Sequence, residues 1–448
     1  MREIITIHVG QAGIQLGNTC WEFFCLEHNI QPDGYKTSKE LISGDEDAFR
    51  TFFSETSDPN KYTARSIFMD LEPDAIDHLR SGTYSELFPV EQMISAKEGA
   101  SHNFARGYCT VGRQYVELCL DRIRKVAVQC QDLQGFIVFN SLGGGTGSGL
   151  GSLLLENLSA EYEKKTKVSV PIYPSAQGST SVVEPYNTAL ATKYQMDHTD
   201  VTTLMENEAL YGINRKHLQI EKPSYINLNN VVAQMVSSMT ASMRLDGCLN
   251  ENLDELEKNL IPYPAVHFTF SSFTPFVPED VLKMQTSELE LTLSLFSADY
   301  MSIKCDPNQA KYMAVNMLYR GEYIPKNIGA AFSTFKTRRL VSFVDRCPTG
   351  CKVGIDYHPP VVIPESKIRP EKKNVCMLAN SSAISQVFSR NEEEFDKMYK
   401  NRAFLHWYLS EGMEEGNFVE ARENLASLQL DYREIEREEE DEEAGEDV

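Results

Sequence analysis

The chain has 448 residues, a hydrophobic content of 42% and a net charge of −22. This length predicts about three domains, and the composition is that of a globular chain with a sizeable core. The negative charge argues against a nucleic-acid partner, because binding to phosphates needs clustered lysine and arginine. About two fifths of that charge lies in the last fifteen residues, where ten acids from Glu434 onward are set against Arg437 alone.

The N-terminus and the cysteines predict a cytosolic protein without a membrane partner. The start, Met-Arg-Glu-Ile, lacks the apolar stretch of a signal peptide, and no run of residues approaches the length of a membrane span. The ten cysteines are scattered, and no spacing among them completes a zinc set. We therefore expect free, mostly buried thiols in a reducing compartment.

In chain order, apolar strands alternate with helices through the first half. A strand covers residues 2–9, and Gly10-Gln-Ala-Gly13 is expected to turn it into a helix that begins near Ile14. A second strand ends in Asp70, Glu72 and Pro73. A helix and two further strands are predicted at residues 115–129, 135–139 and 167–174. This alternation favours a parallel α/β sheet covered on both faces, with ligands at the carboxyl ends of its strands.

A glycine-rich loop separates one of these strands from a helical pattern over 150–158. It reads Gly143-Gly-Gly-Thr-Gly-Ser-Gly149. Such a loop makes a cradle for polyphosphate, because glycine lets backbone amides approach the ligand and the helix N-terminus adds partial positive charge. The loop lacks the Gly-Lys-Ser/Thr of a P-loop and is denser in glycine than the dinucleotide fingerprint. Taken alone, it is equally well interpreted as a flexible linker.

The pattern changes in the second half. From about residue 208 longer helices precede strands at 265–270 and 340–344, which suggests a second, α+β domain to about residue 380. Residues 384–437 contain no proline and show two long helical patterns, with a break between Gly412 and Gly416. From Glu438 onward the sequence is low-complexity acid, for which we expect disorder.

Six motifs stand out in the sequence: Gly10-Gln-Ala-Gly13, the glycine loop, Val183-Glu-Pro-Tyr-Asn187, Leu245-Asp-Gly-Cys-Leu-Asn250, Cys347-Pro-Thr-Gly350 and Arg402-Ala-Phe-Leu-His-Trp-Tyr408. Together they resemble the tubulin family, from Met1 to about Tyr432. Within it the chain resembles the α type, because Glu255 stands where β chains carry lysine and the segment between Pro360 and Val375 is long; other departures indicate a divergent isotype.

The resemblance implies an architecture in four parts. A parallel-sheet, Rossmann-like GTPase domain would cover residues 1–206, and an α+β intermediate domain residues 207–383. A C-terminal helical hairpin would cover residues 384–437, and the disordered acidic tail residues 438–448.

The resemblance also implies a function in the microtubule cytoskeleton of the cytoplasm. The chain would bind GTP and Mg²⁺, form an obligate heterodimer with β-tubulin and polymerise head to tail with other tubulin dimers. Its own GTP would be neither exchanged nor hydrolysed. Motors and microtubule-associated proteins with basic surfaces would bind the C-terminal helices and the acidic tail.

Thirteen positions match the family's nucleotide-binding residues, and Glu72 among them would also hold the metal ion. An acid here suits Mg²⁺, which binds one or two carboxylates together with phosphate oxygens and water. Asp70 lies beside it, and a solvated strand end is the simpler interpretation of an isolated Asp-x-Glu. The thirteen are Gln11, Glu72, Ser141, Gly143, Gly144, Gly145, Thr146, Gly147, Thr180, Glu184 (ribose), Asn207, Tyr225 and Asn229 (guanine).

Glu255 matches the catalytic residue that acts on the GTP of a neighbouring β subunit. A lone glutamate on a helix is usually only solvated. The family pattern around it is incomplete, because Asn252 stands where an acid is expected. Near the phosphates, Gly99 replaces an aspartate and His102 an asparagine, although a neutral histidine still donates one hydrogen bond.

Two alternatives compete with a polymer subunit that has a composite GTPase site. A metabolic enzyme on a doubly wound sheet would need a histidine, cysteine or lysine near the glycine loops, and none is evident. A non-polymerising, tubulin-like regulatory or binding protein is favoured slightly by the departures at Gly99 and His102. Co-purification with β-tubulin and GTP would separate a subunit from an enzyme.

Overall fold

The computed structural model describes most of the chain. The predicted acidic tail lies outside the described residues, as does the motif from Asp246 to Asn250. In the described part, no helix combines the length and the hydropathy that a bilayer crossing requires. The described ranges are 2–37, 48–175, 178, 180–245, 252–279, 287–307, 310–338, 341–344, 350–364 and 366–437.

One mixed sheet runs through the molecule in the order β11-β10-β13-β9-β8-β7-β6-β1-β4-β5, with β12 paired to β10. The strands from β5 to β9 pair in parallel, whereas β13 is antiparallel to β9 and β10. The strands are β1 Glu3–Val9, β2 Phe53–Glu55, β3 Tyr62–Ala64, β4 Ser66–Asp70, β5 Met93–Ser95, β6 Leu133–Ser141, β7 Thr166–Tyr173, β8 Val201–Glu206, β9 Phe268–Thr274, β10 Lys311–Gly321, β11 Ser342–Phe343, β12 Cys351–Asp356 and β13 Lys373–Ser381.

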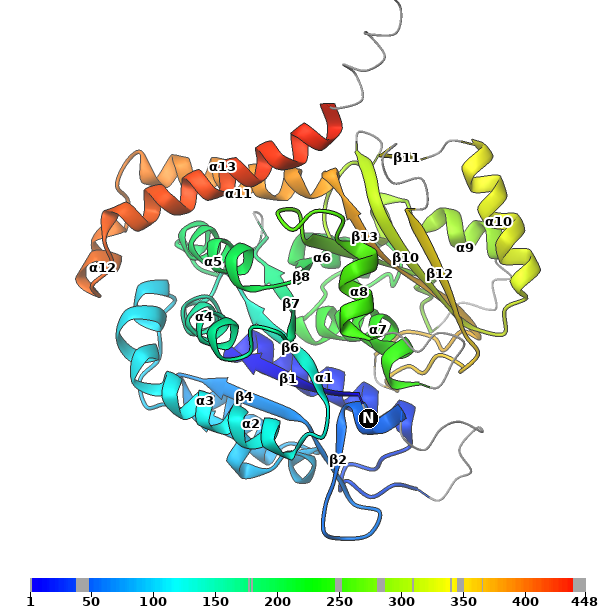
Figure 1. Cartoon of the computed structure of the whole chain (residues 1–448), viewed down its shortest axis with the longest axis horizontal. Coiled ribbons are helices and arrows are strands. Elements are labelled where there is room, and N and C mark those ends of the chain that lie inside the picture. Colours follow the sequence, from blue (N-terminus) through cyan, green and yellow to red (C-terminus); the bar gives the residue numbers. More distant parts are fainter. Residues whose placement is uncertain are drawn as a thin grey trace, which may run out of the picture.

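Helices cover both faces of the sheet, which confirms the predicted α/β class. Helices α3 and α4 pack on one face of β1 and β6, and α1, α2 and α7 pack on the other. Helices α11 and α13 lie together across α5 (Figure 1). The helices are α1 Gly10–His28, α2 Pro73–Ser81, α3 Val111–Gln129, α4 Gly151–Glu161, α5 Glu184–His198, α6 Asn207–Lys216, α7 Tyr225–Arg244, α8 Leu253–Leu260, α9 Glu288–Ser294, α10 Pro325–Arg338, α11 Ser385–Tyr399, α12 Leu405–Ser410 and α13 Glu415–Arg437.

The junction of β1 and α1 differs from the prediction. The helix begins at Gly10 rather than near Ile14. Gly10 has φ +74°, a left-handed conformation that glycine adopts without a Cβ clash, so the chain turns within one residue. Residues 10–13 are therefore the first turn of the helix, and their amides point out of its N-terminus.

Two strands in the second half have bounds that differ from the predicted ones. Strand β9 begins at Phe268, three residues after the predicted start, and continues to Thr274. The predicted end was wrong because Ser271 and Ser272 are buried polar residues: the Ser272 hydroxyl donates to the carbonyl oxygen of Leu295 at 2.8 Å. Of the strand predicted at 340–344, the structure describes residues 341–344, and within them Ser342–Phe343 form strand β11.

The C-terminal helical region also differs in detail. Helix α13 begins at Glu415, so Gly416 lies inside it rather than in the break, and a short helix, α12, stands between α11 and α13. Strand β9 pairs in parallel with β8, so the sheet is continuous across residue 206. The domain boundaries at 206 and 383 stay predictions.

The eight cysteines in the described part of the chain are free thiols, as expected. Five of them are buried. Burial raises the pKa of the Cys119, Cys305 and Cys376 thiols to about 12, which keeps them protonated and unreactive at neutral pH.

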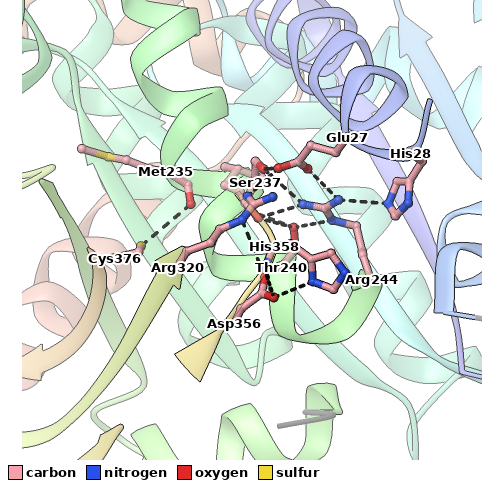
Figure 2. A network of polar contacts seen from close by, with 11 residues as sticks. Glu27, His28, Met235, Ser237, Thr240, Arg244, Arg320, Asp356, His358 and Cys376 are labelled. Carbon is pink, nitrogen blue, oxygen red and sulfur yellow. Dashed lines mark hydrogen bonds and ion pairs between the residues drawn. The ribbon is translucent and has the colours of Figure 1, made fainter. Parts of the chain in front are cut away.

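A buried ion network joins the two halves of the sheet (Figure 2). Glu27 of α1 accepts from Arg244 of α7 at 2.8 Å and from Arg320 of β10 at 2.5 Å. Arg320 lies 3.6 Å from Asp356 at the end of β12. Each of these four side chains is at most 4% exposed. The network, defined by these four residues, contains two cations and two anions and therefore balances its own charge.

Candidate functional site

A cavity of about 340 Å³ lies at the carboxyl ends of five neighbouring parallel strands. Gly10 follows β1, Asp70 ends β4, Ser141 ends β6, Pro174 follows β7 and Asn207 follows β8, and all five residues line the cavity. This is the edge at which open α/β sheets bind ligands. All thirteen predicted nucleotide-binding residues also line the cavity. Their contacts with a nucleotide stay predictions.

The two glycine turns pack closely against each other at the wall of this cavity. A Cβ added at Gly10 would lie 3.1 Å from the amide nitrogen of Gly147, and a Cβ at Gly147 would lie 2.5 Å from the carbonyl oxygen of Ser141. The glycine loop passes into a π-helical turn, Thr146–Leu150, which continues as α4. The cavity is thus lined by the N-terminal residues of two helical segments, whose free N–H groups favour an anion.

Two buried amide side chains brace the glycine loop at its ends. Asn140 Nδ2 donates to the carbonyl oxygen of Gly147 at 2.9 Å, and Asn187 Nδ2 donates to that of Gly143 at 2.8 Å. Sequence reasoning did not assign either residue a role. The signal for Asn140 was a polar residue inside an apolar strand, and Asn187 stood within the quoted Val183–Asn187 motif.

The carboxylates at the end of β4 suit a cation. Burial raises the pKa of Asp70 to about 6, because the charged form is desolvated, although the amide of Glu72 donates to Asp70 Oδ1 at 3.3 Å. A nearby cation would stabilise that charged form. In the described residues no cluster of three or more histidine, cysteine or acidic side chains could hold a metal alone. Magnesium here would need phosphate oxygens and water as well.

Glu72 occupies the space that a side chain at position 99 would need. A Cβ added at Gly99 would lie 2.0 Å from Glu72 Oε1. Gly99 is therefore compatible with the position of Glu72 in this chain. His102 lines the cavity with its backbone in a left-handed conformation, φ +57°, and its carbonyl oxygen accepts from Asn187 at 2.7 Å.

The opposite end of the cavity carries the residues predicted for ribose and guanine. Glu184 Oε1 accepts from the amide and hydroxyl of Thr180 at 2.9 and 2.8 Å, and from the amide of Ser181 at 3.1 Å. These bonds leave Oε2 for a ribose hydroxyl. Asn207 begins α6 and Tyr225 begins α7, where Asn229 follows one turn later. An aromatic ring and two amides in one cavity suit a purine base.

Glu255 does not line this cavity. It is exposed in the first turn of α8. Its neighbour Asp254 accepts from the hydroxyl of Thr166 on β7 at 2.7 Å, which ties α8 to the sheet. Glu255 is thus exposed and away from the cavity, whereas Asp254 has a partner on the sheet, and the catalytic role of Glu255 stays a prediction.

The side chains around the cavity carry little positive charge. Among the described residues that line it there is no lysine and no arginine. An anion bound here would be neutralised by backbone amides, helix N-termini and a cation.

Comparison with known families identifies the same two regions. Residues 3–215 match the Tubulin/FtsZ family, GTPase domain, and residues 264–393 match the Tubulin C-terminal domain. The first match contains the glycine loop, the carboxylates of β4 and Asn207, and the two matches together span most of the chain. The chain therefore belongs to the tubulin superfamily, whose GTPase domain binds GTP in cytoskeletal proteins.

Proposed function

We propose that the chain is an α-type tubulin subunit that binds GTP, pairs with β-tubulin and polymerises head to tail in cytoplasmic microtubules. One observation carries the proposal. The cavity collects all thirteen predicted nucleotide-binding residues, while the predicted catalytic Glu255 is exposed on another element. In this proposal the cavity binds this chain's own GTP, and Glu255 acts in the hydrolysis of the GTP that is bound to the neighbouring subunit.

The chain's own site is built to hold a nucleotide. Amides of Gly10 to Ala12 and of Gly143 to Gly147 would bind the phosphates. Glu184 would bind the ribose, and Asn207, Tyr225 and Asn229 the base. Asp70, Glu72 and the Thr146 hydroxyl would hold Mg²⁺, which would neutralise phosphate charge.

Hydrolysis needs a group that orients a water molecule in line with the γ-phosphate. Asp70 and Glu72 are assigned to the cation, and Glu184 is held by Thr180 and Ser181. This site therefore binds GTP without hydrolysing it. Glu255 supplies the missing carboxylate to the GTP of the adjoining β subunit, so hydrolysis follows assembly.

Other surfaces would serve further partners. Helices α11 and α13 lie on the outside of the molecule (Figure 1). Together with the acidic residues 438–448 they would bind motors and microtubule-associated proteins through their negative charge.

The decisive experiment is Glu255→Ala in polymers assembled with the co-purified β subunit. Losing a positioned base lowers rates by about 10² to 10⁴. Phosphate release should fall by that factor while polymers still assemble. Lys258→Ala changes another exposed residue of α8 and is the matched control. Release at the wild-type rate from the Glu255 variant would refute the catalytic role.

A non-polymerising, tubulin-like regulatory protein is the second candidate. Gly99 and His102, which depart from the family near the phosphates, favour it. Native purification with mass spectrometry of bound protein and nucleotide distinguishes the two candidates. A polymer subunit should co-purify with one β-tubulin per chain and with GTP. A regulatory protein should purify without a stoichiometric β-tubulin partner.

A further inference from the structure

Asn187 on α5 connects the cavity to the C-terminal helices. Its side chain is fully buried. Nδ2 donates to the carbonyl oxygens of His102 and Gly143 at 2.7 and 2.8 Å. Oδ1 accepts from the amide of Phe104 at 3.1 Å and from the hydroxyl of Tyr408 at 2.6 Å. The amide therefore uses two donors and two acceptor positions, its full capacity.

These partners fix the direction of every bond. Two carbonyl oxygens face Nδ2, and the N–H of Phe104 faces Oδ1, so exchanging the two ends of the amide would break these three bonds. Tyr408 must be the donor, since Oδ1 can only accept. One hydrogen-bonded chain thus runs from Tyr408 of α12 through Asn187 to Gly143 of the glycine loop.

Helix α12 is tied to the same region at two further points. Asn103 Nδ2 donates to the carbonyl oxygen of Trp407 at 3.1 Å. Thr110 Oγ1 donates to Glu411 at 2.7 Å. The Tyr408 ring also packs edge-on against Tyr186 of α5, with ring centroids 5.8 Å apart. The position of α12 is therefore coupled to the segment that carries His102.

We propose that Asn187 is a positioning residue for the bound nucleotide and that Tyr408 holds it in place. The proposal rests on the proposed binding of GTP in this cavity. Asn187 holds the loop of His102 and the glycine loop at a fixed separation. A nucleotide is held less firmly when these loops separate, so a shift of α12 that withdraws the Tyr408 hydroxyl weakens its retention.

The test is Tyr408→Phe in the full chain, purified with the partner subunit that accompanies it. This change removes one hydroxyl, keeps the ring and leaves every residue that lines the cavity unchanged. The control is Tyr432→Phe, another buried tyrosine of the C-terminal helices, whose hydroxyl donates to the carbonyl oxygen of Phe268 at 3.4 Å. Both variants lose one buried hydrogen bond, but only the first loses one to Asn187.

Two measurements decide the outcome. The β-bound nucleotide is first exchanged for labelled GTP, so the unlabelled guanine nucleotide that stays in the complex reports on this chain's cavity. Its loss during incubation with EDTA, which removes Mg²⁺, should be about fivefold faster for Tyr408→Phe, the effect of one net hydrogen bond, and unchanged for Tyr432→Phe. Hydrogen exchange of the Phe104 amide, which donates to Asn187, should accelerate in the same variant only.

The two measurements separate this proposal from the function on which it rests. If the wild-type chain carries no guanine nucleotide, the proposed GTP binding fails, and exchange at Phe104 alone decides the role of Asn187. If both tyrosine variants change equally, or Tyr408→Phe changes neither quantity, the positioning role is overturned while GTP binding stands. Asn187→Asp replaces both donors with acceptors and should release nucleotide faster still; a folded Asn187→Asp protein with wild-type release also overturns the proposal.

Discussion

The nucleotide cavity and the buried ion network handle buried polarity in opposite ways. At the cavity, the glycine loop is held by neutral groups, the amides of Asn140 and Asn187. In the ion network, Glu27 lies between the guanidinium groups of Arg244 and Arg320. One region leaves its charge unbalanced until a ligand arrives, whereas the other is already neutral.

The difference follows from the task of each region: the cavity must accept a ligand, and the ion network must hold two parts of the sheet together. A site that receives a polyphosphate gains nothing from side chains that already pair with each other, and neutral amides keep their backbone donors free for the ligand. A contact that joins two halves of a sheet must stay closed. Buried opposite charges do this, because separating them leaves each one desolvated and unpaired.

The largest effect is expected from breaking the ion network. Glu27→Ala leaves Arg244 and Arg320 buried without their shared anion, which should lower the free energy of unfolding by about 3–5 kcal/mol. Asp77→Ala breaks an exposed pair with Arg80 at 3.2 Å and should cost at most about 1 kcal/mol. Urea denaturation of both variants checks the difference. Equal midpoints would show that Glu27 is not essential to the junction.

At the cavity, two glycines of one loop should behave differently. Gly147→Ala places a Cβ 2.5 Å from a backbone oxygen that cannot move aside, so overpacking should cost about 1–3 kcal/mol of stability and release the nucleotide. A Cβ at Gly144 meets no protein atom within 4 Å. Gly144→Ala should therefore keep the stability of the wild type and weaken only nucleotide retention. Denaturation and nucleotide content, measured together, test both statements.

Two buried histidines, His8 on β1 and His28 beside the ion network, limit stability in acid. Burial lowers the pKa of His8 to about 3; burial, with help from the charge of Arg244, lowers that of His28 to about 3 as well. The folded pKa lies below the unfolded value of 6.5, so the stability is present above pH 6.5 and lost as pH falls towards 3. Each histidine contributes about 1.4 kcal/mol per pH unit in that window.

Substitution separates the two histidines. Between about pH 6.5 and 4, the free energy of unfolding of the wild type falls as the pH is lowered, because each histidine binds a proton only on unfolding. His8→Gln and His28→Gln should each remove the contribution of one proton from that slope. His28 has a second constraint, because Arg244 donates to its Nε2 at 3.2 Å and so requires that nitrogen to be unprotonated. Unfolding measured at half-unit pH steps gives the slopes. Slopes equal to the wild-type value would contradict the assignment.

The sequence predicted the cavity better than it predicted what holds the cavity together. Glycine spacing and strand ends placed Gly143, Thr146 and Asp70 at one edge of a sheet, because parallel strands share their carboxyl ends. The amides of Asn140 and Asn187 produce no periodicity, and an amide's partners depend on tertiary contacts. Glu27 and Arg320 lie 293 residues apart, a distance at which no local pattern signals a pair.

The smallest effect concerns the departure at Gly99. Gly99→Asp would bring a third carboxylate beside Asp70 and Glu72, and it would push aside the Glu72 carboxylate, which lies 2.0 Å from the new Cβ. Glu72 is exposed and long, so it can rotate away, and stability should change by no more than about 0.5 kcal/mol. The added charge should increase by about twofold to fivefold the factor by which removal of Mg²⁺ lowers nucleotide retention, which is the range of an exposed charge pair.

Gly99→Ala makes the same steric demand without the charge and is the control. If both variants alter retention equally, the position of Glu72 decides the effect; if only the aspartate variant does, the site responds to charge, as expected of a cavity that contains no lysine or arginine among its described lining residues.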